Sequence, residues 1–244
     1  MRTLPLLVAL SLLGACTTHV LIPAEERTRL ERDLTGKDRD RFLRLSCYVT
    51  PFFGDSTKRL LTSVMPDEVR LLEQPSGESI NPGPIEKLIP AGTRARIVSV
   101  EFPTSFAMAE RVLFTPRTQP WVTVEVESQP AKPPLVLVLR PMLKTADEAV
   151  AEIERTLTRD DPAPTLGGFT EAVREAVRTK GAVVEMPAAA LEMAWGYPER
   201  KQISFDGSVR MEEWTWPGGR RAATLADGRV LKLVGAGKNV TVQQ

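Results

Sequence analysis

The feature that most constrains this chain is the short apolar run near its start. Residues 4–13 (LPLLVALSLL) follow a single cation, Arg2, and precede the small pair Gly14-Ala15. Ten residues are well below the roughly 20 that a helix needs to cross a bilayer. A cationic start, a short apolar core and small residues before a cleavage point are typical of a secretory signal. Residues 1–15 are therefore predicted to be removed, and the folded body to begin after them.

The residues that follow this run have a recognisable order. Leu13-Gly14-Ala15-Cys16 resembles the lipobox of bacterial lipoproteins, which lipoprotein signal peptidase reads. The resemblance implies a diacylglycerol on the Cys16 thiol, cleavage between Ala15 and Cys16, and an acyl chain such as palmitate on the new amino group. The residue after Cys16 is Thr17. In proteobacterial lipoproteins, a residue other than Asp at this position favours the outer membrane and a position facing the periplasm. The alternative is an ordinary signal peptide with a Cys at this position.

Composition gives no sign of a polyanionic partner. Charged residues make up 26% of the chain and apolar residues 42%, which is ordinary for a globular protein. The formal net charge is +1, and loss of Arg2 with the signal removes that excess. Neither nucleic acid nor anionic lipid is therefore an expected partner. No stretch after Cys16 is apolar for long enough to span a membrane, so the N-terminal lipid is the expected membrane contact.

Cys47 is the other cysteine of the chain. If Cys16 carries lipid, Cys47 has no disulfide partner within the chain. The thiol then either bridges to another chain in an oxidising compartment or is a small buried apolar group. The apolar setting Leu45-Ser46-Cys47-Tyr48-Val49 favours burial.

Residues 16–44 are predicted to be a tether and a charged spacer. The tether contains His19, the only histidine, and residues 24–44 carry seven basic and six acidic side chains. Leu30 and Leu34 can seed a short amphipathic helix that Gly36 ends. Because mixed charge of this kind usually marks a solvated face, the segment is expected to lift the body away from the membrane.

Residues 45–161 are predicted to form a β-rich domain that ends in a helix. Four segments have the apolar, β-branched or alternating pattern of strands, and Pro- and Gly-rich loops separate them: 48–53, 93–102, 121–127 and the central 135–139. Short strands of this kind, in a chain with 20 prolines, predict a small antiparallel barrel or sandwich. Thr145-Ala146-Asp147-Glu148 has the form of a capping box. It predicts a helix with Ile153 and Leu157 on its apolar face.

Two passages in this domain resemble bacterial SH3-like barrels. In residues 89–97 the turn Pro90-Ala91-Gly92 leads into a strand, and Trp121 opens a later strand. The resemblance implies a cell-wall-binding module and makes peptidoglycan an alternative partner.

Residues 162–168 are the predicted domain boundary, and residues 169–235 a second domain. Two helices followed by an antiparallel meander are expected there, in this order: 171–180 after the cap Thr170, 187–195 before Gly196, 202–205, 209–216, 220–225 and 229–234. The predicted fold class is therefore α+β, with a β-rich domain followed by an ααβββ domain.

Three stretches of the second domain resemble the SmpA/OmlA (BamE-like) lipoproteins. They are residues 186–198, with Trp195-Gly196-Tyr197-Pro198 at their end, the strand Glu213-Trp214-Thr215-Trp216, and residues 225–230. The resemblance implies a BamE-like domain with a role in outer-membrane assembly or maintenance. Glu185 and Pro187 stand where that family has Gly and Thr, and the module ends a long chain instead of making up most of it.

No catalytic arrangement is evident, and no cofactor or metal is expected. Because His19 lies in the tether, the body lacks the His of Ser-His, Cys-His and His-based metal sites. Gly167-Gly168 precedes a helix but lacks the Lys-Ser/Thr of a phosphate-binding loop. Adjacent carboxylates such as Glu212-Glu213 point to opposite faces of a strand, which disfavours a carboxylate-based hydrolase.

The candidate partner contacts are Trp214, Trp216, Arg220 and Arg221. The two tryptophans stand two apart on a predicted strand and so share a face. Either they fill the core with Trp195, or one is an exposed anchor with the two arginines as its polar rim. The sequence thus predicts a lipid-anchored, non-enzymatic protein that binds or scaffolds envelope proteins, with peptidoglycan binding as the alternative.

Overall fold

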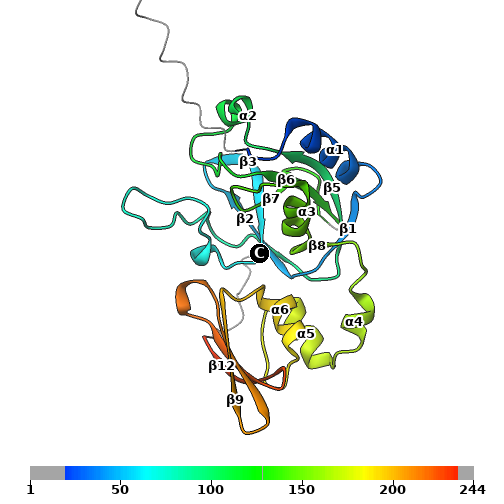
Figure 1. Ribbon diagram of the computed structural model, residues 1–244, viewed down its shortest axis with the longest axis vertical. Helices are drawn as coiled ribbons and strands as arrows, with labels where there is room; N and C mark the ends of the chain where they lie inside the picture. The colour runs from blue at the N-terminus through cyan, green and yellow to red at the C-terminus, as the bar shows by residue number, and fades with distance from the viewer. Residues whose placement is uncertain (1–19, 128, 236–244) are drawn as a thin grey trace, which may run out of the picture.

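The computed structural model describes residues 20–127 and 129–235 of the chain. The predictions for residues 1–15, Cys16, Thr17 and His19 lie outside them. Six α-helices, a sheet of eight strands and a sheet of four strands make up the described part, so the α+β class is confirmed. Figure 1 shows the large sheet in the upper part of the molecule and the smaller one in the lower part.

The first domain holds two of the longer helices and the eight-stranded sheet. Its elements are α1 (Ala24–Thr35), β1 (Asp40–Leu43), β2 (Cys47–Phe52), β3 (Asp55–Thr62), the 3₁₀ helix η1 (Pro66–Glu68), β4 (Lys87–Ile89), β5 (Arg94–Glu101), α2 (Ser105–Glu110), β6 (Trp121–Val126), β7 (Leu135–Val138), α3 (Ala146–Glu154) and β8 (Leu157–Thr158).

The second domain holds one short α-helix, two longer ones and a four-stranded meander. Its elements are α4 (Ala163–Gly167), α5 (Glu171–Thr179), α6 (Ala188–Trp195), β9 (Arg200–Asp206), β10 (Val209–Thr215), the 3₁₀ helix η2 (Pro217–Gly219), β11 (Ala222–Ala226) and β12 (Arg229–Val234).

The large sheet is mixed, whereas the sequence predicted an antiparallel barrel or sandwich. Its strand order is β4-β2-β3-β7-β6-β5-β1-β8, and β3 pairs with β7 in parallel. The four predicted strands correspond to β2, β5, β6 and β7, and β7 is central as expected. Val122, Val124 and Val126 are all buried, as the alternation in β6 predicted. Strands β1, β3, β4 and β8 were not predicted.

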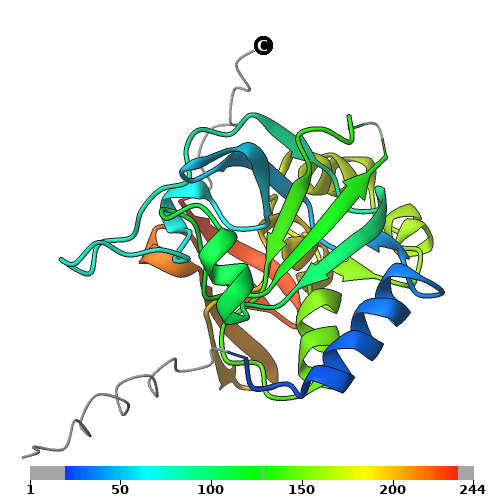
Figure 2. The ribbon, with the colours of Figure 1, turned by 90° about the horizontal axis from the view of Figure 1, so that it is seen from above.

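The segment predicted to be a charged spacer belongs to the first domain. Helix α1 buries Leu30 and Leu34 in the main core, and β1 pairs with β5 and β8. Figure 2 shows α1 and α3 together beside the sheet, and the two helices contact each other. Leu30 and Leu34 are four residues apart and share one helical face, and this apolar pair outweighs the charge around it. The domain therefore begins before residue 45.

The predicted cap of α3 is confirmed, but the helix is shorter than expected. Thr145 Oγ1 accepts a hydrogen bond from the Glu148 backbone N–H at 3.1 Å. The Glu148 carboxylate accepts from Lys144 N–H at 2.7 Å, one residue before the position that a capping box uses. Leu157 is buried in β8, because the helix ends at Glu154.

The second domain has the predicted order of helices followed by an antiparallel meander. Its sheet order is β12-β11-β10-β9, and the four strands correspond to the four predicted segments, so the ααβββ pattern is one strand short. Thr170 caps α5 as predicted, and Lys180, with φ +54°, ends it in the left-handed conformation one residue before Gly181. Among the described residues, no helix combines the length and the apolar character needed to cross a membrane.

Candidate functional site

The predicted aromatic contacts lie inside the second domain. Trp195, Trp214 and Trp216 are only 3%, 2% and 1% exposed. The rings of Trp195 and Trp216 meet edge to face with their centroids 4.9 Å apart. Trp216 Nε1 donates to the Gly196 carbonyl at 3.0 Å, and Trp214 Nε1 donates to the Glu212 carboxylate at 2.9 Å. The structure therefore agrees with the core interpretation, and neither Trp214 nor Trp216 is available as an exposed anchor.

The two predicted rim arginines contact the first domain of the same chain. Arg221 forms a buried ion pair with Glu68 of η1, with Nη2 2.6 Å from Oε2. Arg220 is mostly exposed and pairs with Asp67. The hypothesis of a rim for an external partner is corrected on this point, because both acceptors belong to η1. Because Arg221 and Glu68 are 153 residues apart in the sequence, local patterns could not predict this pairing.

Lys180 is a second buried cation at the same junction. Its Nζ donates to the carbonyls of Ser46 and Ala194, both at 2.7 Å, and of Ser63 at 3.0 Å. The Nζ also lies 4.8 Å from the centre of the Tyr48 ring. Burial lowers the pKa of Lys180 to about 7. Three of these residues come from the first domain, so Lys180 fastens α5 to it.

Cys47 lies beside this junction and is fully buried, as its setting predicted. Burial raises the pKa of its thiol to about 12. A neutral thiol without solvent access is neither a nucleophile nor a metal ligand. Among residues 20–127 and 129–235, no three His, Cys, Asp or Glu side chains cluster in a way that could hold a metal ion.

A pocket of about 740 Å³ lies along β1, β5 and β6 and has a charged lining. Arg96 and Asp40 both line it and pair with each other at 3.2 Å. Arg41 is 3% exposed, and within the described residues its Nε and Nη2 have no hydrogen-bond partner. Burial, followed by the nearby charge of Arg159, lowers the pKa of Arg41. Several of the lining residues are charged. Among the described lining residues there is no Ser, Thr, Cys or His that could act as a nucleophile.

Four large apolar side chains are exposed on α2 and the segment after it. Phe106, Leu113 and Phe114 are 71%, 73% and 71% exposed, and Val112 is 42% exposed. These four residues are called the apolar end patch below. Large apolar side chains gathered on a surface mark sites that contact proteins or membranes.

Two arginines hold the backbone of this segment from beneath. The buried Arg111 donates to the carbonyls of Arg117 at 2.8 Å and Gln119 at 2.7 Å, and its guanidinium lies 3.8 Å from the centre of the Trp121 ring. Arg117 Nε donates to the Met108 carbonyl at 2.8 Å. Burial lowers the pKa of Arg111 to about 10, so this side chain stays charged at neutral pH. The segment is thus anchored while its apolar side chains remain in solvent.

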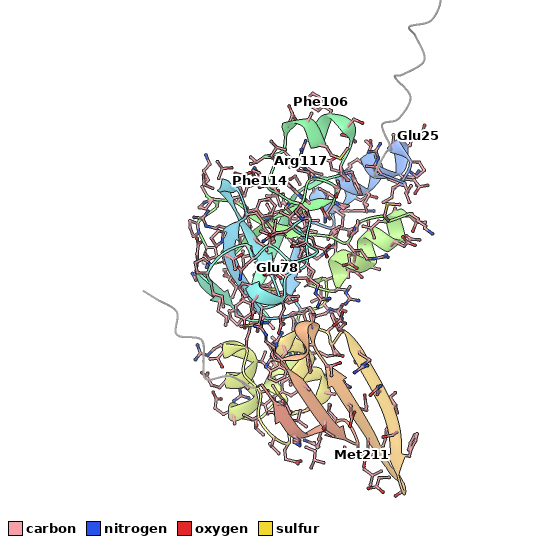
Figure 3. All side chains as sticks on the ribbon, turned by 90° about the vertical axis from the view of Figure 1, so that its left-hand side faces the viewer. Glu25, Glu78, Phe106, Phe114, Arg117 and Met211 are labelled. Carbon is pink, nitrogen blue, oxygen red and sulfur yellow. The ribbon has the colours of Figure 1, made fainter. Side chains whose placement is uncertain are left out.

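Phe106 and Phe114 of the apolar end patch lie toward the end of the molecule where the described chain begins. Figure 1 shows α2 at the top, beside the start of the described chain. Figure 3 shows Phe106 at the tip, with Phe114 below it and Glu25 of α1 near the same end. Met211, in the meander of the second domain, lies at the opposite end.

The sequence contained a signal for this patch that the prediction did not use. Val112-Leu113-Phe114 are three consecutive apolar residues between predicted strands. An exposed run of this kind is unusual unless it has a function.

No protein-family model matches this chain, and neither a curated protein nor a solved structure does.

Proposed function

We propose that this protein is a lipid-anchored lipoprotein of the bacterial outer membrane, facing the periplasm. It acts as a non-enzymatic binding or scaffold protein in envelope assembly or maintenance. The observation that carries the proposal is Leu13-Gly14-Ala15-Cys16, directly after a short apolar run. Cys16 stands four residues before Val20, the first described residue. A lipid at Cys16 would therefore hold the folded body close to the membrane.

The joint between the domains supports a scaffold role. The buried Arg221–Glu68 pair and two of the carbonyl contacts of Lys180, those to Ser46 and Ser63, cross it. Surfaces on the two domains are thereby held in a fixed relation, which a scaffold requires.

Strand β9 supports a role in binding other proteins. It is an edge strand of the smaller sheet and is exposed along its whole length. Ile203 and Phe205 on this strand are 55% and 71% exposed. An extended segment of a partner can add to such an edge through backbone hydrogen bonds.

The BamE-like assignment of residues 169–235 is part of this proposal. The order of two helices and a meander supports it, as does the packing of Trp195 on Trp216. The fourth strand counts against it.

The alternative is peptidoglycan binding by an SH3-like first domain. Gly92, with φ +87° ahead of β5, and Trp121 at the start of β6 support that resemblance. The parallel pairing of β3 with β7 counts against it. Retention of the purified full-length protein on peptidoglycan would favour this alternative.

Mass spectrometry of the mature protein tests the anchor. The expected N-terminal residue is Cys16, carrying a diacylglycerol on sulfur and an acyl chain on nitrogen. Cys16→Ala should stay uncleaved, whereas Cys47→Ala should be processed normally. Finding residues 1–15 intact, or Cys16 unmodified, would overturn the proposal. Crosslinking in intact cells and affinity purification would then identify the envelope partner.

A further inference from the structure

We infer that the apolar end patch lies in the interface of the same bilayer that holds the lipid on Cys16. The protein would then touch the membrane at two places, the acylated Cys16 and the side chains of Phe106, Leu113 and Phe114. This inference rests on the proposed lipid anchor and adds to it a defined orientation of the folded body.

Chain geometry connects the patch with the membrane. Cys16 and Val20 are four residues apart, and four extended residues reach at most about 14 Å. The end of the folded body at which Val20 lies must therefore face the bilayer. Figures 1 and 2 both place α2 at that end, and Figure 3 shows Phe106 at its tip.

The chemistry of the patch suits a bilayer interface. Phe and Leu are typical of the apolar faces that enter the boundary between headgroups and acyl chains, to a depth of about 5–10 Å. Arg111 and Arg117 already fix the backbone through carbonyl hydrogen bonds. Little further ordering of this segment is then needed when it contacts the bilayer. Less of the free energy gained by burying apolar side chains is therefore lost as conformational entropy.

The orientation has a consequence for the second domain. Figure 1 is drawn with the longest axis vertical, α2 at the top and β9 at the bottom. Contact through α2 therefore directs the exposed β9 edge away from the bilayer, where periplasmic proteins can reach it.

The test compares two matched aromatic positions at opposite ends of the molecule. Phe106 and Phe205 are both 71% exposed, and Phe205 lies on β9. Full-length acylated protein carrying Phe106→Cys or Phe205→Cys is labelled with an environment-sensitive thiol dye. It is then reconstituted into phosphatidylcholine vesicles with brominated acyl chains. An acylated Cys16 and the buried Cys47 take up no dye, so the label reports only the introduced thiol.

The dye at position 106 should shift to shorter wavelength and lose fluorescence to the bromines. The dye at position 205 should do neither. Phe114→Cys should behave like Phe106→Cys, and it keeps the test available if one substitution disturbs α2. Vesicles without bromine control for any change in fluorescence that membrane attachment alone causes.

The remaining outcomes separate the two proposals. If the dyes at positions 106 and 205 show the same wavelength shift and the same quenching in a chain with acylated Cys16, the membrane contact is overturned and the anchor still stands. Dye uptake by the parent chain would reveal a free Cys16 thiol and overturn the anchor. A disulfide between two unlabelled Phe106→Cys copies on vesicles, formed in place of quenching, would assign the patch to self-association and overturn the inference.

Discussion

At the scale of single residues, Lys180 gives the protein a specific dependence on pH. Burial lowers its pKa from 10.5 to about 7, so above pH 7 the unfolded chain holds a proton that the folded chain has released. The free energy of unfolding should therefore rise from about pH 7 to 8.5, by at most about 1.4 kcal/mol per pH unit. Above pH 9, burial of Cys47 acts in the opposite direction, because its thiol ionises only in the unfolded chain.

Urea unfolding at several pH values checks this prediction. Lys180→Met should remove the rise, although it also leaves three carbonyls without a donor. Lys87→Met, at an exposed position of β4, is the matched control and should keep the rise. An unchanged slope in Lys180→Met would show that another group is responsible.

Arg221 and Arg220 allow a buried ion pair to be compared with an exposed one in the same loop. Arg221→Met leaves the carboxylate of Glu68 buried without a partner and should lower the free energy of unfolding by about 3–5 kcal/mol. Arg220→Met breaks only the exposed pair with Asp67 and should cost no more than about 1 kcal/mol. Denaturant unfolding measures both. Adding Glu68→Gln to Arg221→Met should recover part of the loss, and a further additive loss would contradict the pairing.

At the scale of elements, features that depend on local chemistry were predicted better than features that depend on long-range pairing. The caps at Thr145 and Thr170 follow from side chains that reach only three residues ahead, and both are present. Strand β6 was predicted because its valines alternate. Strand β3 was missed because Asp55-Ser56-Thr57-Lys58-Arg59 is polar. It pairs with β2 across a short turn and, on its other side, with β7 far along the chain. The Arg221–Glu68 pair and the burial of Lys180 arise from the same kind of distant contact, so periodicity could not predict them.

Helix α1 shows how a charged segment can still belong to the core. Leu34 is 2% exposed and Leu21, just before the helix, is 42% exposed. Leu34→Ala should lower the free energy of unfolding by about 2–5 kcal/mol, because it removes buried methyl groups and leaves a cavity. Leu21→Ala should change it by less than about 1 kcal/mol. Thermal unfolding followed by circular dichroism compares the two. Equal, small effects would restore the interpretation of this segment as a spacer.

At the scale of the whole molecule, the domain junction decides whether the two domains behave as one body. Gly196 ends α6 with φ +82° and ψ −179°, a conformation that side chains disfavour. A Cβ at this position would stand 3.2 Å from Ser63 Oγ of the first domain. The backbone conformation therefore favours glycine here, and an added Cβ would also press on the Ser63 side chain. The same Gly196 carbonyl accepts from Trp216, which connects the junction with the core of the second domain.

Gly196→Ala should therefore weaken the junction more than the backbone conformation alone explains. We expect a loss of about 1–3 kcal/mol from strain, with further loss from the contact with Ser63. Gly207→Ala is the control, because Gly207 also has a positive φ, +60°, but has nothing within 4 Å of an added Cβ. Calorimetry should show one transition for the parent chain and for Gly207→Ala, since cooperative unfolding requires intact contacts between the domains. Gly196→Ala should show two transitions. If it instead shows one, shifted no further than that of Gly207→Ala, the junction does not couple the domains, and an orientation fixed at the α2 end would not be transmitted to β9.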